Sequence, residues 1–367
     1  MGPHSRKIKG ENHSFTDLKR LKKDKKKLKE EKLLKLMDDG SVDPKCTIEN
    51  SETKIPAMST LSIAVPGSII DNAQSPELRT YLGGQIARAA CIFKVDEIVV
   101  FDDLGNRNIA DNSIQEDMEG RIVRHCCIQL ARILQYLECP QYLRKYFFPI
   151  HKDLQYAGLL NPLDAPHHMR QNDKFSYREG VTTNLPAKAG KGSVVNCGLL
   201  KDVSVDKNLT PGIRVTVKLL QSREGSKKIH GIIVPPSLPS AETGVYWGYT
   251  VRIAQSLGEV FSQAPYTGGY DLTIGTSERG NKVDDIPQRS LQYSHAVVVF
   301  GGLHGLEAAL DNDEVLTVDD PALVFDHYLN TCSGQGSRTI RTEEAILISL
   351  AELRSKLIPK LNSPVGK

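Results

Sequence analysis

The sequence has little of what marks membrane, disulfide-rich or zinc-ribbon proteins. Its 367 residues include one tryptophan, and aromatic residues make up 6% of the chain. The seven cysteines are an odd number and contain no CxxC pair, which favours reduced thiols in a nuclear or cytosolic compartment. No apolar run approaches the roughly 20 residues of a membrane-spanning helix. The first thirty residues are polar and basic, unlike a secretory signal.

Several familiar motifs are also absent. The chain has no GxxxxGK[ST], no GxGxxG after its first predicted strand, no HExxH and no GxSxG. These absences argue against a P-loop NTPase, a Rossmann-type dehydrogenase, a zincin and an α/β-hydrolase. The content of 40% hydrophobic and 25% charged residues is typical of a folded core. The length predicts two or three domains.

The charge is unevenly distributed along the chain. Residues 1–36 hold 13 Lys or Arg against 5 Asp or Glu, a net of +8, whereas the whole chain has a net charge of +3. The basic block at 19–35 is either a nuclear address or RNA contact, or a solubilising tail without a partner. Residues 37–59 are polar, contain Pro44 and Pro56, and are predicted to be a linker.

From residue 59 onwards the pattern predicts an α/β domain. The apolar runs 61–65 and 96–103 read as buried strands, and helices are expected at 75–93, where Ser75 is a good N-cap, and at 118–138. Strand and helix alternate at a spacing that favours a parallel sheet. The same pattern resumes after residue 240, and Thr342 is predicted to begin a final helix over 342–357.

Between 176 and 240 short strands follow one another without a helix. Five runs (181–185, 192–200, 201–205, 213–220 and 227–234) are separated by turn residues. Five strands in about sixty residues suit a small closed barrel, with an OB-fold favoured. We therefore expect residues 59–175 and 241–362 to form one discontinuous α/β domain, interrupted by a barrel at 176–240.

Three segments of the second half share one pattern, an apolar strand followed by a loop of small or polar residues. They are LTIG with TSERG (272–280), VVVF with GGLHG (297–305) and VFDHYL with NTCSGQGS (324–337). Loops at the carboxyl ends of parallel strands gather in one crevice, where ligands bind. Glycines there let the backbone approach a flat ligand, and Arg279 could hold a carboxylate or phosphate. Each single glycine loop could equally be a plain turn.

Other conspicuous residues have a structural alternative. Tyr246, Trp247 and Tyr249 could stack on bases or pack beneath the barrel. Neighbouring His167 and His168 are expected to point apart, so no metal site is predicted. His304 is expected to face solvent, Cys126 and Cys127 to fill the core, and Cys332, inside a ligand loop, has no evident base nearby.

The three loop segments, together with the final helix sequence, resemble the SPOUT methyltransferases. The closer similarity, over about residues 60–360, is to the eukaryotic and archaeal branch of RNA methyltransferases whose α/β domain carries an OB-like insert. The resemblance implies a trefoil-knotted C-terminal half, S-adenosyl-L-methionine (SAM) as cofactor, an RNA substrate and a homodimer. Members in animals are linked to the mitotic spindle and kinetochore, so a nuclear or cytoplasmic chain associated with the spindle is expected.

The resemblance also assigns cofactor-binding positions. They lie in the first knot loop, in the loop before the last helix and at one position near the methionine end or the RNA: Gly301, Gly302 and Leu303; Asn330, Thr331, Gln335, Gly336 and Ser337; and Arg279. No catalytic base is identified by it.

If the resemblance holds, the predicted reaction is SAM-dependent methylation of an RNA base such as N3 of uridine, with Arg279 stabilising the uridine anion. The basic faces of the barrel would bind RNA through Lys201, Arg214, Lys218, Lys227 and Lys228. The alternative function is a catalytically idle RNA-binding or spindle scaffold that keeps the knot for dimerisation.

Overall fold

The computed structural model describes residues 58–105, 114–116, 122–185, 192–220 and 229–360. The basic tail, nearly all of the predicted linker, and Lys227 and Lys228 lie outside the described residues. Within them, no helix is long and apolar enough to cross a membrane.

The body of the molecule is a six-stranded, wholly parallel sheet with the order β10-β2-β1-β13-β11-β14. Its strands are β1 (Thr60–Pro66), β2 (Glu97–Phe101), β10 (Thr250–Ala254), β11 (Leu272–Lys282), β13 (His295–Val299) and β14 (His327–Asn330). The central strands are apolar on both faces, as expected for strands covered by helices on each side. The predicted parallel α/β sheet is confirmed.

Helices cover both faces of this sheet. Side chains of α2 (Pro76–Ile92), α3 (His125–Glu138) and α8 (Thr342–Leu353) share one hydrophobic core with Ile63, Ile98 and Val298. Side chains of α6 (Leu257–Ser262) and α7 (Gly305–Asp311) share a second core with Val99 and Val297. Because successive strand residues face opposite sides, neighbouring residues of one strand belong to different cores.

The predicted helix at 75–93 forms as α2, with the Ser75 side chain accepting a hydrogen bond from the backbone N–H of Leu78. The helix predicted over 118–138 is too long. Residues Ile122–Arg124 form strand β4, paired antiparallel with β3 (Ile114–Glu116), and α3 starts only at His125. The β-branched pair at 122 and 123 favours a strand, and a tertiary contact between Arg124 and Asp102 holds the last residue of β4.

The final helix also ends earlier than predicted. It stops at Leu353, and Leu357–Pro359 form strand β15, which pairs in parallel with β12 (Leu291–Tyr293). Backbone hydrogen bonds from Arg289 to Ser355 and from Leu291 to Lys356 take up the chain after the helix. Partners distant in sequence therefore decide this helix end.

Five strands form a closed barrel in the order β5-β6-β7-β9-β8. They are β5 (Tyr177–Thr182), β6 (Val194–Asn196), β7 (Val203–Ser204), β8 (Arg214–Leu219) and β9 (Ile229–Val234). Val195, Val203 and Val217 fill the interior. The predicted small closed barrel is confirmed, and all five strands lie between the second and third sheet strands in the sequence.

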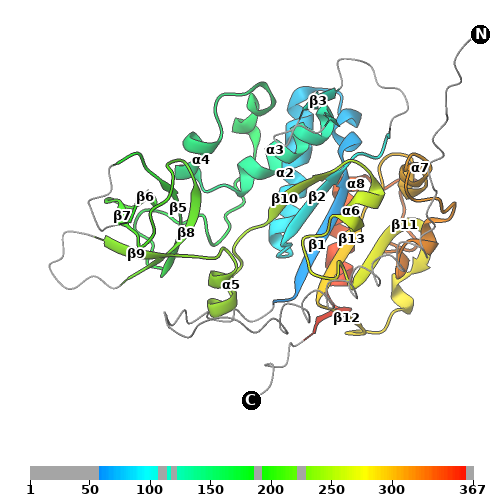
Figure 1. Ribbon diagram of the computed structural model, residues 1–367. Coiled ribbons are helices and arrows are strands. Elements are labelled where there is room, and N and C mark those ends of the chain that lie inside the picture. The colour runs from blue at the N-terminus through cyan, green and yellow to red at the C-terminus, as the bar shows by residue number, and fades with distance from the viewer. Residues whose placement is uncertain (1–57, 106–113, 117–121, 186–191, 221–228, 361–367) are drawn as a thin grey trace, which may run out of the picture.

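The barrel lies beside the β10 edge of the sheet, while β11 and α7 lie towards the other edge (Figure 1). Shorter elements connect these parts: α4 (Gln141–Phe147), α5 (Leu238–Thr243), and the 3-10 turns Gly67–Asn72, Lys152–Leu154, Ala157–Leu159, Val283–Asp285 and Pro321–Leu323.

Candidate active site at the carboxyl edge of the sheet

Two of the predicted ligand loops follow β13 and β14, which flank β11 in the sheet. The third predicted loop, TSERG (276–280), is not a loop after the strand but a bulged part of β11 itself, which continues to Lys282. Hydrogen bonds tie the loops together. Asn330 donates from Nδ2 to the carbonyl of Glu278 at 2.9 Å, and Thr342, the first residue of α8, donates from Oγ1 to the carbonyl of Gly301 at 3.0 Å. The structure thus brings the loops predicted from sequence to one edge of the sheet.

The GGLHG loop is a tight turn in which Gly301 and Gly305 are required for different structural reasons. A Cβ on Gly301 would lie 2.7 Å from the backbone of Gly305, so packing within the turn requires glycine at 301. Gly305 has a φ of +78°, which favours glycine. Leu303, at the tip, has 73% of its surface exposed.

Gly302 faces outward from this turn towards the ends of β1 and β2. A Cβ there would lie 2.9 Å from Oδ2 of Asp103 and 3.3 Å from Oγ of Ser68. The first glycine loop therefore touches two polar side chains, both of which the sequence reasoning missed. The only sequence signal was the position of each just after an apolar strand, a position shared with many ordinary turn residues.

The loop after β14 is held at its start and open further along. Asn330 Oδ1 accepts the N–H of Cys332 at 3.0 Å, and the Thr331 and Ser349 hydroxyls lie 2.6 Å apart. Gln335 donates to the carbonyl of Ser337 at 3.0 Å. Among the residues that the structure describes, no heavy atom lies within 4 Å of where a Cβ would stand on Gly336, so the end of the loop has an uncovered face there.

Arg279 lies where β11 bulges. The register between β11 and β14 shifts between Thr276 and Asn281, so Arg279 stands outside the regular ladder. Its guanidinium is 3.2 Å from Oε1 of Glu307, and 73% of the side chain is exposed. The hydroxyl of Tyr328 donates to the same Glu307 oxygen at 3.4 Å. Arg279 thus presents an accessible positive charge beside the glycine loops.

Most of the proposed RNA-stacking and basic residues lie elsewhere than predicted. Tyr246, Trp247 and Tyr249 are buried, and each donates a hydrogen bond inside the molecule, so the packing alternative is correct. Arg214 is held by Glu138 and Glu179 and does not face solvent as a free cation. The guanidinium is thus committed to these two carboxylates, and an RNA contact of Arg214 stays a prediction.

Lys218 and Lys201 differ in how their ammonium groups are placed. Lys218 pairs with Glu242 at 2.7 Å and keeps a partly exposed side chain. Lys201 is exposed and remains a candidate for RNA contact.

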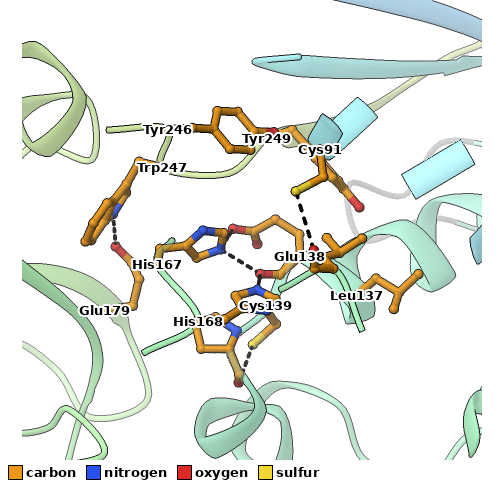
Figure 2. Close-up of polar contacts among 12 residues, drawn as sticks. Cys91, Leu137, Glu138, Cys139, His167, His168, Glu179, Tyr246, Trp247 and Tyr249 are labelled. Atoms are coloured by element: carbon orange, nitrogen blue, oxygen red, sulfur yellow. Dashed lines mark hydrogen bonds and ion pairs between the residues drawn. The ribbon is translucent and has the colours of Figure 1, made fainter. Parts of the chain in front are cut away.

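The residues that fix the barrel to the sheet domain form a buried polar network (Figure 2). Nε2 of His167 and Nε2 of His168 lie 2.9 Å and 2.6 Å from the backbone oxygen of Glu138. The prediction that the two rings point apart is wrong, because both converge on one carbonyl, with ring centroids 4.4 Å apart. Since a carbonyl only accepts, both imidazoles donate from Nε2.

The carboxylates of the network bind the barrel directly. Arg214 donates to Glu138 at 2.6 Å and 2.9 Å and to Glu179 at 2.8 Å, and Trp247 donates to Glu179 at 2.8 Å. Burial alone would raise the pKa of Glu138, but hydrogen bonds from His167 and Arg214 lower the pKa to about 2. These contacts make the network a structural joint between barrel and sheet.

The fold and the loop cluster coincide with a known protein class. Residues 60–353 match the model of the family described as "Putative RNA methyltransferase", and the chain belongs to this family. The match spans both halves of the sheet and the barrel between them, so the whole architecture is that of the family. The prediction of an RNA methyltransferase is confirmed, and the loops are the candidate site for its methyl donor.

Some relatives of the chain carry more specific names. A 28S rRNA (uridine-N(3))-methyltransferase of Drosophila melanogaster is 56% identical over 366 residues, which cover 98% of this chain and 75% of the relative. The Homo sapiens protein of the same name is 59% identical over 303 residues, covering 82% and 79%. "Putative methyltransferase spot-1" of Caenorhabditis elegans is 38% identical over 355 residues, covering 93% and 91%.

Proposed function

We propose that this chain transfers a methyl group from SAM to N3 of a uridine in large-subunit ribosomal RNA. The observation that carries the proposal is the 56% identity, over nearly the whole chain, to a relative named for that reaction. The bulged end of β11 and the loops after β13 and β14, which lie together at the carboxyl edge of the sheet, support a site of the required kind.

The exposed surfaces and charges of the loops support SAM as the cofactor. The uncovered face at Gly336 and the exposed tip at Leu303 leave backbone and apolar surface for an adenosine. The carboxylate of Glu307 flanks the GGLHG loop and complements a positively charged sulfonium. We assign the cofactor to Gly301, Gly302, Leu303, Asn330, Thr331, Gln335, Gly336 and Ser337.

SAM, when bound, supplies a methyl group activated by the sulfonium. The chain has to orient the uridine, exclude water and stabilise the charge that develops when N3 loses its proton. Holding the reacting atoms about 3–3.5 Å apart could provide roughly 7–11 kcal/mol of the barrier reduction. Arg279, exposed beside the loops, is placed to stabilise negative charge on the uracil ring.

The proposal includes the finer features that the resemblance implies. We propose that the path through 296–340 forms a trefoil knot, to which the Thr342 to Gly301 hydrogen bond would add a fastening. The barrel is proposed to be an OB-like RNA-binding insert, with Lys201 on its exposed surface. A nuclear or cytoplasmic location with spindle or kinetochore association remains part of the proposal.

The decisive test is the modification state of ribosomal RNA in cells with and without this protein. A methyl group on N3 blocks Watson–Crick pairing, so the modified uridine stops reverse transcription and is identified by mass spectrometry. We expect one such uridine to lose its methyl group without the protein and regain it with the wild-type chain. Re-expressed Gly302→Trp should not restore it, since the new ring would collide with Asp103 and Ser68.

A titration with the methyl donor distinguishes an active enzyme from a catalytically idle scaffold. Calorimetry with SAM should show binding at about micromolar concentrations to the wild-type chain and none to Gly302→Trp. A wild-type chain that does not bind SAM, with unchanged ribosomal RNA in the cells that lack it, would contradict the proposed function.

A further inference from the structure

Asp103 lies at the carboxyl edge of the sheet, next to the GGLHG loop, which is part of the candidate site for the methyl donor. It comes two residues after the end of β2, and β1 separates β2 from β13 in the sheet. The Ser68 hydroxyl, after β1, donates to Asp103 Oδ2 at 2.5 Å, and the Ser68 N–H lies 3.3 Å from Oδ1. The Asp103 carboxylate therefore reaches past β1 to Gly302.

The position of this carboxylate is fixed by its surroundings. The Asn312 side chain, following α7, donates to the backbone oxygen of Asp103 at 3.0 Å. Asp103 has only 8% of its surface exposed. Ser68 holds the carboxylate of Asp103 and Asn312 holds its backbone oxygen, so this buried residue has little conformational freedom. Such preorganisation is what a catalytic group needs.

Asp103 forms no salt bridge among the described residues, although the charge of Arg124 also acts on it. The adjacent Asp102 takes the local cation, with Arg124 Nε 3.0 Å from its carboxylate. The Asp103 carboxylate accepts its hydrogen bonds from two neutral groups, the hydroxyl and the backbone N–H of Ser68. Burying a carboxylate without a salt bridge is unfavourable. The presence of Asp103 beside the GGLHG loop therefore suggests a functional reason.

The charges around Asp103 act on its pKa in both directions. Burial is the main effect and raises the pKa, while hydrogen bonds from Ser68 and the charge of Arg124 lower it. Asp102, beside Asp103 in the chain, and the thiol of Cys127 on α3 are the other titratable groups close by. A carboxylate with a raised pKa is a better proton acceptor near neutral pH than an ordinary aspartate.

We propose that Asp103 is the general base of the methylation, an inference that rests on the proposed function. The carboxylate accepts the proton of uridine N3 as the N3–H bond breaks, and the electron pair left on N3 forms the bond to the methyl carbon. The S–CH3 bond breaks at the same time, and its electron pair converts the sulfonium to a neutral thioether. Ser68 is the positioning residue that orients the carboxylate.

Glu307, the other carboxylate at the loop, is less suited to this role. Its Oε1 already accepts from both Arg279 and Tyr328, and its side chain is 30% exposed. An ion-paired carboxylate is a weaker proton acceptor because the cation favours its charged form. Glu307 more simply positions Arg279.

The test compares Asp103→Asn with the wild-type chain and with Asp319→Asn, a matched change at an exposed aspartate in the α7–β14 connection. Turnover on the uridine-containing RNA is measured under saturating SAM and RNA across the pH range, and affinities for SAM and RNA are measured separately. We expect Asp103→Asn to lower kcat by about a hundredfold or more. Asp319→Asn should match the wild type.

The pH profile distinguishes a base from a structural residue. Because the active form of Asp103 is deprotonated and burial raises its pKa, wild-type kcat should fall as the pH is lowered towards that raised pKa, and the residual activity of Asp103→Asn should lack this fall. Ser68→Ala should reduce kcat less and shift the acid limb. Both variants should keep wild-type affinity for SAM, which also shows that the site is folded.

Three results would overturn the assignment: a wild-type kcat independent of pH in the acid range, a turnover of Asp103→Asn within about twofold of the wild type, or a loss of SAM affinity in Asp103→Asn that accounts for the lost activity. Failure of the proposed function appears differently. In that case the wild-type chain itself methylates no uridine, whereas failure of the base alone leaves the wild type active.

Discussion

Arg279 is the residue whose role in the reaction depends most on charge. Its guanidinium is exposed, and Glu307, its ion-pair partner among the residues that the structure describes, is partly exposed. Such a pair contributes little to stability, so the charge can serve a bound RNA. Removing it should therefore affect the reaction more than the fold.

We expect Arg279→Ala to lower kcat by about a hundredfold with little change in SAM affinity, since one donor to a developing anion is lost. Steady-state kinetics on the RNA substrate and calorimetry with SAM check this. Arg354→Ala, at an exposed arginine after α8, is the control. Unchanged turnover in Arg279→Ala would remove this residue from the site.

Asp96 is a carboxylate whose burial lowers the stability of the fold, and it has no part in the proposed reaction. Its Oδ2 accepts the N–H of Leu61 at 2.8 Å, which joins the starts of β1 and β2. Burial raises the pKa of Asp96 from 3.8 to about 6, and the charge of Glu97 adds to the rise. The folded state therefore binds this proton more tightly than the unfolded state does.

The sign of the pH dependence follows. The stabilising contribution of the Asp96 proton is complete below about pH 4 and is lost as the pH rises through about 6. Asp96→Asn keeps an acceptor for Leu61 and removes the charge. It should raise the free energy of unfolding near pH 8 by up to about 3 kcal/mol, from a shift of about two units, and change it little near pH 3. Denaturant titrations at both pH values test this, and a variant less stable than the wild type near pH 8 would contradict it.

At the scale of elements, the joint between barrel and sheet domain is fixed by buried charges. Glu138 ends α3, Arg214 begins β8 and Glu179 lies within β5. Gly248, just before β10, has a φ of +90°, and a Cβ there would lie 2.7 Å from Glu138 Oε1. Charge pairs and close backbone packing thus hold the barrel in one orientation.

The joint should be the acid-sensitive element of the molecule. The pKa of Glu138 is lowered from 4.5 to about 2 in the folded state, so its stabilising effect is present above about pH 4.5 and is lost as the pH falls towards 2. Glu138→Gln should lower the free energy of unfolding near pH 7 by about 3 kcal/mol, because Arg214 is left without its main partner.

The matched control for the joint is Glu242→Gln, which breaks the more exposed pair with Lys218. Exposed pairs contribute at most about 1 kcal/mol, so this variant should unfold nearly as the wild type does. Equal losses of stability in Glu138→Gln and Glu242→Gln would show that the buried pair of the joint contributes no more to the free energy of unfolding than the exposed pair does.

At the scale of the whole molecule, one helical face is left uncovered by the described residues. Leu78, Tyr81 and Ile92 of α2 are between 45% and 52% exposed, as is Leu347 of α8 at 45%. Their spacing along α2 places them on one stripe. A groove of about 300 Å³ between the two helices, lined also by Gln85 and Arg88, runs along the same face.

We expect this face to form the proposed homodimer. Tyr81→Glu combined with Leu347→Glu should convert the dimer to a monomer in light scattering, because the charges would be buried against apolar surface. Leu200→Glu, at a barrel leucine that is 83% exposed, should leave the mass unchanged. A wild-type chain of monomer mass at micromolar concentration would contradict the dimer.

Local patterns predicted much of the fold. The apolar runs that became β1 and β2, the Ser75 cap of α2 and the turn-separated strands of the barrel are decided by neighbours in the sequence. The glycine loops were also found this way, since a loop after a buried parallel strand must lie at the carboxyl edge. The same reasoning failed at 118–138, where a tertiary salt bridge to Asp102 accompanies a strand in place of the first helical turns.

The sequence by itself determined that the chain contains a parallel α/β sheet, a small barrel and a set of glycine-rich loops, because burial patterns and turn residues act over a few positions. Only the tertiary structure decided which charges meet. It placed Asp103 against Gly302, directed Arg214 into the joint with Glu138 and buried Trp247 on Glu179. Such contacts depend on the order of strands in space, and no spacing along the chain records that order.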